Sequence, residues 1–119
     1  MVRVKEGVSL DSMHPKMFLA IAMAAPIWER WGAADLWITG GNEAGHGTGA
    51  RGFHRLQDGT AQAVDIRTWN IPRLACRHKA AKELANILGL LYDVLYEKPG
   101  QQGEHCHVQW DPERPGTNA

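Results

Sequence analysis

Two histidines separated by one residue, His105 and His107, are the clearest chemical signal in the sequence. Side chains alternate across a strand, so in a strand both imidazoles share one face while Cys106 points to the other. Imidazoles gathered on one face need partners, because a buried polar group left unpaired is costly. A metal ion is one such partner, and a half-exposed polar face that binds nothing is the alternative. In either case Cys106 is expected in the core and not among the ligands.

A second cluster combines His54 with Asp65, which lies between Val64 and Ile66 in an apolar, strand-like segment. A carboxylate in that setting needs a cation or hydrogen-bond donors. Arg67, two residues on and therefore on the same face, is the simplest partner, and a metal ion is the other candidate. Together the two clusters supply two histidines and one aspartate. Three protein ligands plus a water are the usual arrangement of a catalytic zinc site.

The elements that must position these residues follow from hydrophobic periodicity and turn residues. The sequence predicts helices over residues 15–31 and 72–88 and strands over residues 36–39, 61–68, 91–97 and 105–110. Asp11 or Ser12 is expected to cap the first helix, and Pro26 to kink it or end it early. The polar loop over residues 98–103 predicts that the last two strands pair antiparallel.

Each predicted helix has an apolar stripe that should face the sheet. Helical spacing selects two sets: Phe18, Ile21, Ala22, Ala25 and Trp28 in the first helix, and Leu84, Ile87, Leu88 and Leu91 around the second. The glycine-rich segment over residues 40–52 is predicted to be a long irregular loop, of the kind that is usually either functional or disordered. The expected fold is α+β, a small antiparallel sheet with two main helices packed on it.

Length and composition limit the possible classes of protein. The chain has 119 residues, suited to a single domain over residues 1–119 with a loose tail over residues 112–119. Thirteen basic and thirteen acidic residues cancel, so no charge excess indicates nucleic-acid binding. Two cysteines are too few for a disulfide framework. The apolar run over residues 17–25 fits an amphipathic helix better than a signal peptide and is too short for a membrane span.

Taken in order, the motifs resemble the zinc peptidases grouped with lysostaphin, D-Ala-D-Ala carboxypeptidases and hedgehog, and above all their small phage-type members. The family pattern is Ser-x-His-x-x-Gly-x-Ala-x-Asp followed later by His-x-His. The matching segments are Val4 to Leu10, Trp37-Ile38-Thr39-Gly40 with Glu43, Ala63 to Thr68, Tyr92 to Glu97 and His105 to Pro112. The resemblance spans nearly the whole chain, and it implies a hedgehog-like or D-Ala-D-Ala-peptidase-like fold.

The resemblance implies that His54, Asp65 and His107 are the zinc ligands. His54 and Asp65 are eleven positions apart, where the family usually has seven, and Gly52 stands where the family has serine. An insertion over residues 55–60 would explain the spacing, because Asp58-Gly59 is a turn signal. His46 is the rival first ligand and otherwise a candidate substrate-binding residue. His54 is preferred because motif order places His46 upstream of the ligand.

Two glutamates are candidates for the catalytic base. Phage-type and hedgehog-like members place a glutamate at the end of the strand before His-x-His, which here is Glu97. The dipeptidase type places it three residues before the zinc histidine, which here is Glu104. A regular strand would point Glu104 away from the metal face, so Glu97 ranks first. The resemblance also implies that His105 lies beside the reacting centre.

The function expected from this resemblance is zinc-dependent hydrolysis of peptide bonds in bacterial peptidoglycan, of carboxypeptidase or endopeptidase type, in a phage-derived lysin or a related enzyme. A hedgehog-like binding module that keeps zinc without turnover is the second reading, and a metal-free structural protein the third. The expected state is a monomer that is made in the cytoplasm and acts on the cell wall after release or export. Its expected partner is a peptidoglycan peptide, with no nucleic acid and no membrane span.

Overall fold

The computed structural model describes residues 1–42 and 61–112, which form one five-stranded sheet and two helices. The elements in chain order are β1 (Val2–Val4), α1 (Pro15–Arg30), β2 (Leu36–Gly40), β3 (Ala63–Ile66), α2 (Leu74–Leu88), β4 (Tyr92–Glu97) and β5 (His105–Trp110). The order across the sheet is β1-β2-β3-β5-β4. β1 pairs parallel with β2, and every other neighbouring pair is antiparallel. The α+β class is therefore confirmed, but the sheet is mixed and not purely antiparallel.

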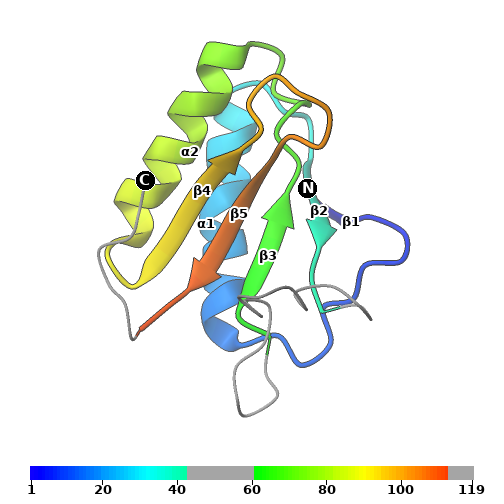
Figure 1. Cartoon of the computed structure of the whole chain (residues 1–119), viewed down its shortest axis with the longest axis vertical. Helices are drawn as coiled ribbons and strands as arrows, with labels where there is room; N and C mark the ends of the chain where they lie inside the picture. The colour runs from blue at the N-terminus through cyan, green and yellow to red at the C-terminus, as the bar shows by residue number, and fades with distance from the viewer. Residues whose placement is uncertain (43–60, 113–119) are drawn as a thin grey trace.

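Both helices cover the same face of the sheet, and no helix of the described residues covers the opposite face (Figure 1). Trp28 and Met17 of α1 and Leu84 of α2 are fully buried against core residues of the central strands. The indole Nε1 of Trp28 donates a hydrogen bond to the carbonyl of Arg67 at 2.8 Å, so this buried tryptophan has its polar atom satisfied. The main hydrophobic cluster thus lies on the helix side of the sheet.

Most predicted elements are present, with differences at their ends. α2 begins at Leu74, two residues after the predicted start at Pro72, and β3 is shorter than the predicted strand. Pro26 does not end α1, which continues to Arg30. β1 was not predicted, because three exposed residues carry no periodic signal. In the described segments no helix has the length and apolar character to cross a bilayer.

The predicted cap and stripes of the helices are partly wrong. α1 is capped by His14, whose Nδ1 accepts a hydrogen bond from the backbone N–H of Lys16 at 3.1 Å, and not by Asp11 or Ser12. Phe18, Ile87 and Leu91 were expected to face the core but are about half exposed. The side chains that are buried instead are Met17, Ala20, Ala24 and Ile27 in α1, and Ala80, Ala81 and Ala85 in α2.

The loop between β4 and β5 is the local structure that shapes the candidate site. The two strands pair antiparallel, as predicted, with Glu97 opposite His105. Gly100 and Gly103 adopt φ angles of 72° and 86°, a region that favours glycine because it has no Cβ. The loop reverses the direction of the chain. Its last two residues, Gly103 and Glu104, directly precede β5, which carries the two histidines.

Candidate metal centre

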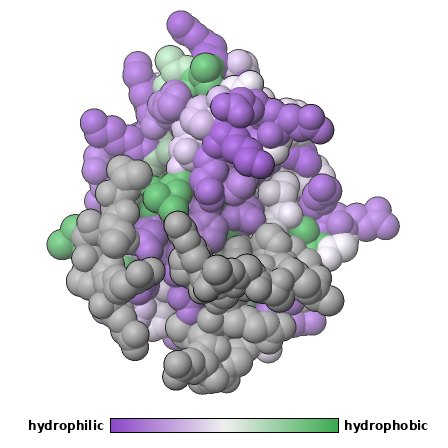
Figure 2. Space-filling model, viewed as in Figure 1, coloured by the Kyte–Doolittle hydropathy of each residue, from purple (hydrophilic) through white to green (hydrophobic). Residues whose placement is uncertain are grey.

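Three of the polar residues predicted from the sequence, Asp65, His105 and His107, lie on the sheet face that neither α1 nor α2 covers. In β5 the side chains of His105, His107 and Gln109 alternate with Cys106 and Val108, which are in the core. Asp65 in β3 is directly opposite His107 across the strand pair. The described part of this face is mostly hydrophilic in the space-filling view (Figure 2). Strand pairing thus brings Asp65 of the second cluster to the histidines of the first.

His107 lies between two oxygen atoms. Its Nδ1 is 3.0 Å from Oδ1 of Asp65, and its Nε2 is 3.0 Å from Oε1 of Gln109. Burial lowers the pKa of His107, but the hydrogen bonds to Asp65 and Gln109 outweigh burial, so the pKa lies above its usual value of 6.5. Both ring nitrogens therefore have fixed directions, which suits a residue that must present one nitrogen to a ligand.

The geometry of this pair fits a metal ion with little movement. Two ligand atoms that bind one tetrahedral zinc at ~2.05 Å are ~3.3 Å apart. Nδ1 of His107 and Oδ1 of Asp65 are 3.0 Å apart, so the pair would need to open by only a few tenths of an ångström. Gln109 would then keep its hydrogen bond to Nε2, the kind of outer contact that orients a metal-binding histidine. Residues 1–42 and 61–112 contain no complete group of three such ligands.

His105 pairs with Glu97 at the more exposed end of the same face. Nε2 of His105 is 3.2 Å from Oε1 of Glu97, and Nδ1 donates to the carbonyl of Gly103 at 2.8 Å. A carbonyl oxygen can only accept, so Nδ1 carries a hydrogen. The contact between Nε2 and the carboxylate is then a hydrogen bond only when a further proton lies between them. Nε2 of His105 is also 3.8 Å from Oδ1 of Asp65, so the imidazole lies beside two carboxylates.

Glu104 points to the opposite side, as strand alternation predicted, and its side chain is only 2% exposed. Its oxygens accept hydrogen bonds from Thr68 Oγ1 at 2.5 Å, the Gly100 N–H at 2.7 Å and Arg77 Nη1 at 3.0 Å. Burial raises the pKa of Glu104, but the bonds from Thr68, Gly100 and Arg77 outweigh burial and hold it below the usual value. This carboxylate therefore joins α2 to the hairpin.

Cys106 is fully buried in the hydrophobic core, on the side away from His105 and His107. The prediction of its position is confirmed. Desolvation raises the pKa of its thiol far above the usual range, with a smaller contribution from Asp65. A thiol held neutral in an apolar setting is a poor metal ligand, because metals bind the thiolate.

Arg67 and Asp65 do not form the ion pair that the sequence suggested as the simplest arrangement. Asp65 pairs with the two histidines, and the guanidinium of Arg67 lies against the indoles of Trp37 and Trp69. Gln109 was missed in the sequence, although its place two residues after His107 on the same strand face was a usable signal. The candidate residues His46 and His54 lie outside the described residues.

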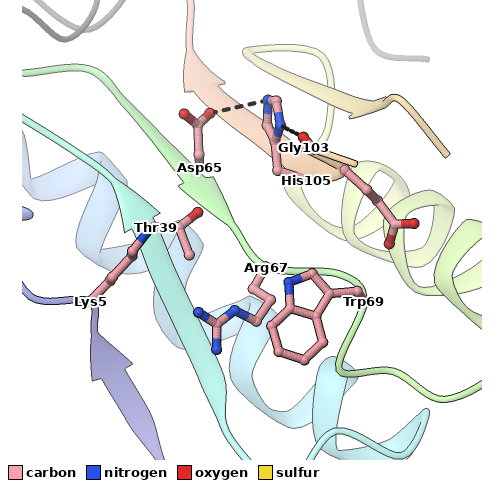
Figure 3. Close-up of a pocket in the computed structure, with 8 residues that line it drawn as sticks. Lys5, Thr39, Asp65, Arg67, Trp69, Gly103 and His105 are labelled. Atoms are coloured by element: carbon pink, nitrogen blue, oxygen red, sulfur yellow. Dashed lines mark hydrogen bonds and ion pairs between the residues drawn. The ribbon is translucent and has the colours of Figure 1, made fainter. Parts of the chain in front are cut away.

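A pocket of about 300 Å³ adjoins the Asp65–His105 pair. It is lined by Lys5, Thr39, Asp65, Arg67, Trp69, Gly103, Glu104 and His105. Asp65 and His105 lie at one end of the group, and Arg67 and Trp69 lie at the other (Figure 3). The candidate centre therefore borders a space in which a ligand could rest.

No protein-family model matches the sequence, and neither a curated protein nor a solved structure shows significant similarity to it.

Proposed function

We propose that the chain is a zinc-dependent peptidase that hydrolyses peptide bonds of bacterial peptidoglycan, with the hedgehog-like and D-Ala-D-Ala-peptidase-like architecture that its motifs resemble. The observation that carries the proposal is the pairing of Asp65 with His107 across β3 and β5, at a separation close to that of two zinc ligands. His54 is the proposed third protein ligand, and its position is assigned from motif order alone. Peptidoglycan as substrate follows only from the family resemblance.

Under this proposal the residues around the pair take different roles in amide hydrolysis. Zinc in such a site supplies a Lewis acid that polarises the scissile carbonyl and makes a bound water acidic. Glu97 is the proposed base, because its side chain is 46% exposed and beside His105, whereas Glu104 is held by three donors. Glu97 takes a proton from the attacking water and passes it to the leaving amine. His105 donates a hydrogen bond to the oxygen that becomes negative.

The decisive experiment is digestion of purified peptidoglycan by protein loaded with one equivalent of zinc. New free amino groups should appear with the zinc-loaded protein and should be absent after treatment with a chelator. A zinc-loaded protein that binds peptidoglycan but releases no amino groups would favour the binding-module alternative. A protein that takes up no zinc at all would contradict both and favour a metal-free structural role.

The metal assignment has its own test, the replacement of His107 by alanine. Loss of this ligand should remove the zinc, abolish turnover and eliminate the thermal stabilisation that zinc gives to the folded state. His78→Ala is the matched control. His78 is on α2, where it packs against Tyr96 of β4 and lies away from the candidate centre. Full zinc occupancy in His107→Ala, measured by metal analysis, would overturn the assignment. His54→Ala should lose the metal, and His46→Ala should keep it.

A further inference from the structure

Arg67 occupies an unusual setting for a charged side chain next to a candidate metal centre. Its guanidinium carbon lies 4.9 Å from the ring centre of Trp37 and 4.5 Å from that of Trp69, so two indoles flank it. The backbone is fixed as well, because the Arg67 N–H donates to the carbonyl of Trp37 at 2.9 Å. In the described part of the chain no carboxylate pairs with Arg67, and its buried Nε has no hydrogen-bond partner.

A second cation lines the same pocket. Lys5 follows β1 directly, and its backbone N–H donates to the carbonyl of Ile38 at 2.9 Å, which anchors it beside β2. Its side chain and that of Arg67, which follows β3, border the pocket from the two sides of β2 (Figure 3). Lys5 is exposed and forms no ion pair with any carboxylate in residues 1–42 and 61–112. The two carboxylates that also line the pocket are bonded to other side chains, Asp65 to His107 and Glu104 to Arg77 and Thr68. Lys5 and Arg67 are therefore left to attract an anion.

The distance from the candidate centre limits what this anion can be. Arg67 is two residues after Asp65 on one face of the strand, a separation of ~6.6 Å along the strand. Consecutive Cα atoms of a peptide are ~3.8 Å apart, so that separation corresponds to one or two peptide residues. A volume of about 300 Å³ is at the small end for ligand pockets, and it suits a short chain end better than a long continuing chain.

We propose that Arg67 and Lys5 bind the C-terminal carboxylate of a peptide that is cut one or two residues from its end. The inference rests on the proposed function and narrows it to the carboxypeptidase type. The planar guanidinium, held between Trp37 and Trp69, presents its remaining N–H groups to both carboxylate oxygens. Lys5 adds a point charge from the opposite side of the pocket. Trp69, which is 57% exposed, forms the wall over which the chain end enters.

The test compares two peptidoglycan stem pentapeptides that differ only at the C-terminus, one a free acid and the other a carboxamide. Charge-assisted hydrogen bonds contribute ~1.5–3 kcal/mol, so the zinc-loaded protein should have a kcat/KM roughly 10- to 100-fold higher for the acid. Arg67→Gln should reduce this ratio to about threefold or less by lowering the value for the acid. Arg67→Lys should keep part of the preference, because it retains charge but loses the bidentate geometry.

Two further variants protect the test against misfolding. Lys5→Gln alters an exposed side chain and should reduce the acid preference several-fold without changing the unfolding temperature. Arg73→Gln is the matched control for charge, because Arg73 precedes α2 with no hydrogen bond from its side chain to the helix end, and it should keep the full preference. Equal cleavage of acid and amide by the unmodified protein, or full preference in a folded Arg67→Gln, would overturn the inference.

A binding measurement separates this inference from the proposed peptidase activity. Both peptides are titrated against zinc-loaded Glu97→Gln, which should bind substrate with little turnover. Tighter binding of the acid, together with no cleavage by the unmodified protein, would support the carboxylate pocket and contradict the peptidase. Equal binding and equal cleavage of the two peptides would support the peptidase and contradict the pocket. Equal binding without cleavage would contradict both.

Discussion

Glu97 and Glu104 stand at the two ends of one hairpin loop, but their surroundings are opposite. Glu97 is at the end of β4, with its side chain 46% exposed and its carboxylate beside His105. Glu104 precedes β5, with its side chain 2% exposed and its oxygens bonded to Thr68, Gly100 and Arg77. A carboxylate that three donors hold in a buried position is poorly placed to take a proton from a water on the opposite face of the sheet. The comparison supports Glu97 as the proposed base and Glu104 as a structural residue, and each of these two proposals can be tested separately.

The largest expected effect is on turnover in Glu97→Gln. The amide cannot take the proton of the attacking water, so kcat should fall by roughly a hundredfold or more. Zinc content should remain at one per chain, since Glu97 is not a proposed ligand. The measurement is peptidoglycan hydrolysis with metal analysis of the same preparation. If Glu104→Gln loses turnover while Glu97→Gln keeps it, the comparison is inverted and the dipeptidase-type spacing identifies the base.

The next effect is on stability in Glu104→Gln. Removing one charge of a buried pair leaves Arg77 without its partner, although the amide oxygen can still accept hydrogen bonds. The free energy of unfolding should fall by roughly 2 kcal/mol, which lowers the unfolding temperature by roughly 8 °C. Glu97→Gln is the matched control and should change stability by less than about 0.5 kcal/mol, as an exposed substitution usually does. A Glu104→Gln protein as stable as the unmodified one would show that the buried pair contributes nothing.

Lowering the pH should reduce the difference in stability between the unmodified protein and Glu104→Gln. The pKa of Glu104 in the folded protein lies below its usual value of 4.5, so its stabilisation is complete above that value and is lost as the pH falls through the folded pKa. The gap in unfolding free energy between the unmodified protein and Glu104→Gln should therefore shrink below about pH 4.5. Urea unfolding of both metal-free proteins between pH 6 and pH 3 measures the gap. A gap that is unchanged at pH 3 would contradict the pairing of Glu104 with Arg77.

The smallest expected effect belongs to Cys106→Ala. Cys106 lies between the two histidines in sequence but in the core in space, so its replacement leaves a small cavity that costs ~1 kcal/mol. Zinc binding and turnover should be retained, because the side chain faces away from the candidate centre. Chemical unfolding and metal analysis test the two halves of this prediction. Loss of zinc in a folded Cys106→Ala protein, or a measured zinc–sulfur contact, would place the thiol among the ligands.

Short-range patterns were sufficient to predict several of these features. Alternation along β5 placed His105 and His107 on one face and Cys106 on the other, and it correctly pointed Glu104 away from that face. Hydrophobic periodicity located both helices and four of the strands, because each signal is contained within its own segment. The zinc ligand set, the third ligand in particular, remains a prediction.

Only the tertiary structure decided which residues became partners across these segments. Strand register placed Asp65 opposite His107, and the packing of α2 brought Arg77 to Glu104. The start of α1 was decided in the same way, since the His14 N–H donates to the carbonyl of Ala61 at 2.8 Å and the chain before the helix is thereby fixed. Asp11 and Ser12 were equally good caps by local propensity. Contacts between residues far apart in sequence made His14 the cap of α1. The capping preferences of single residues contribute little compared with a backbone hydrogen bond and burial.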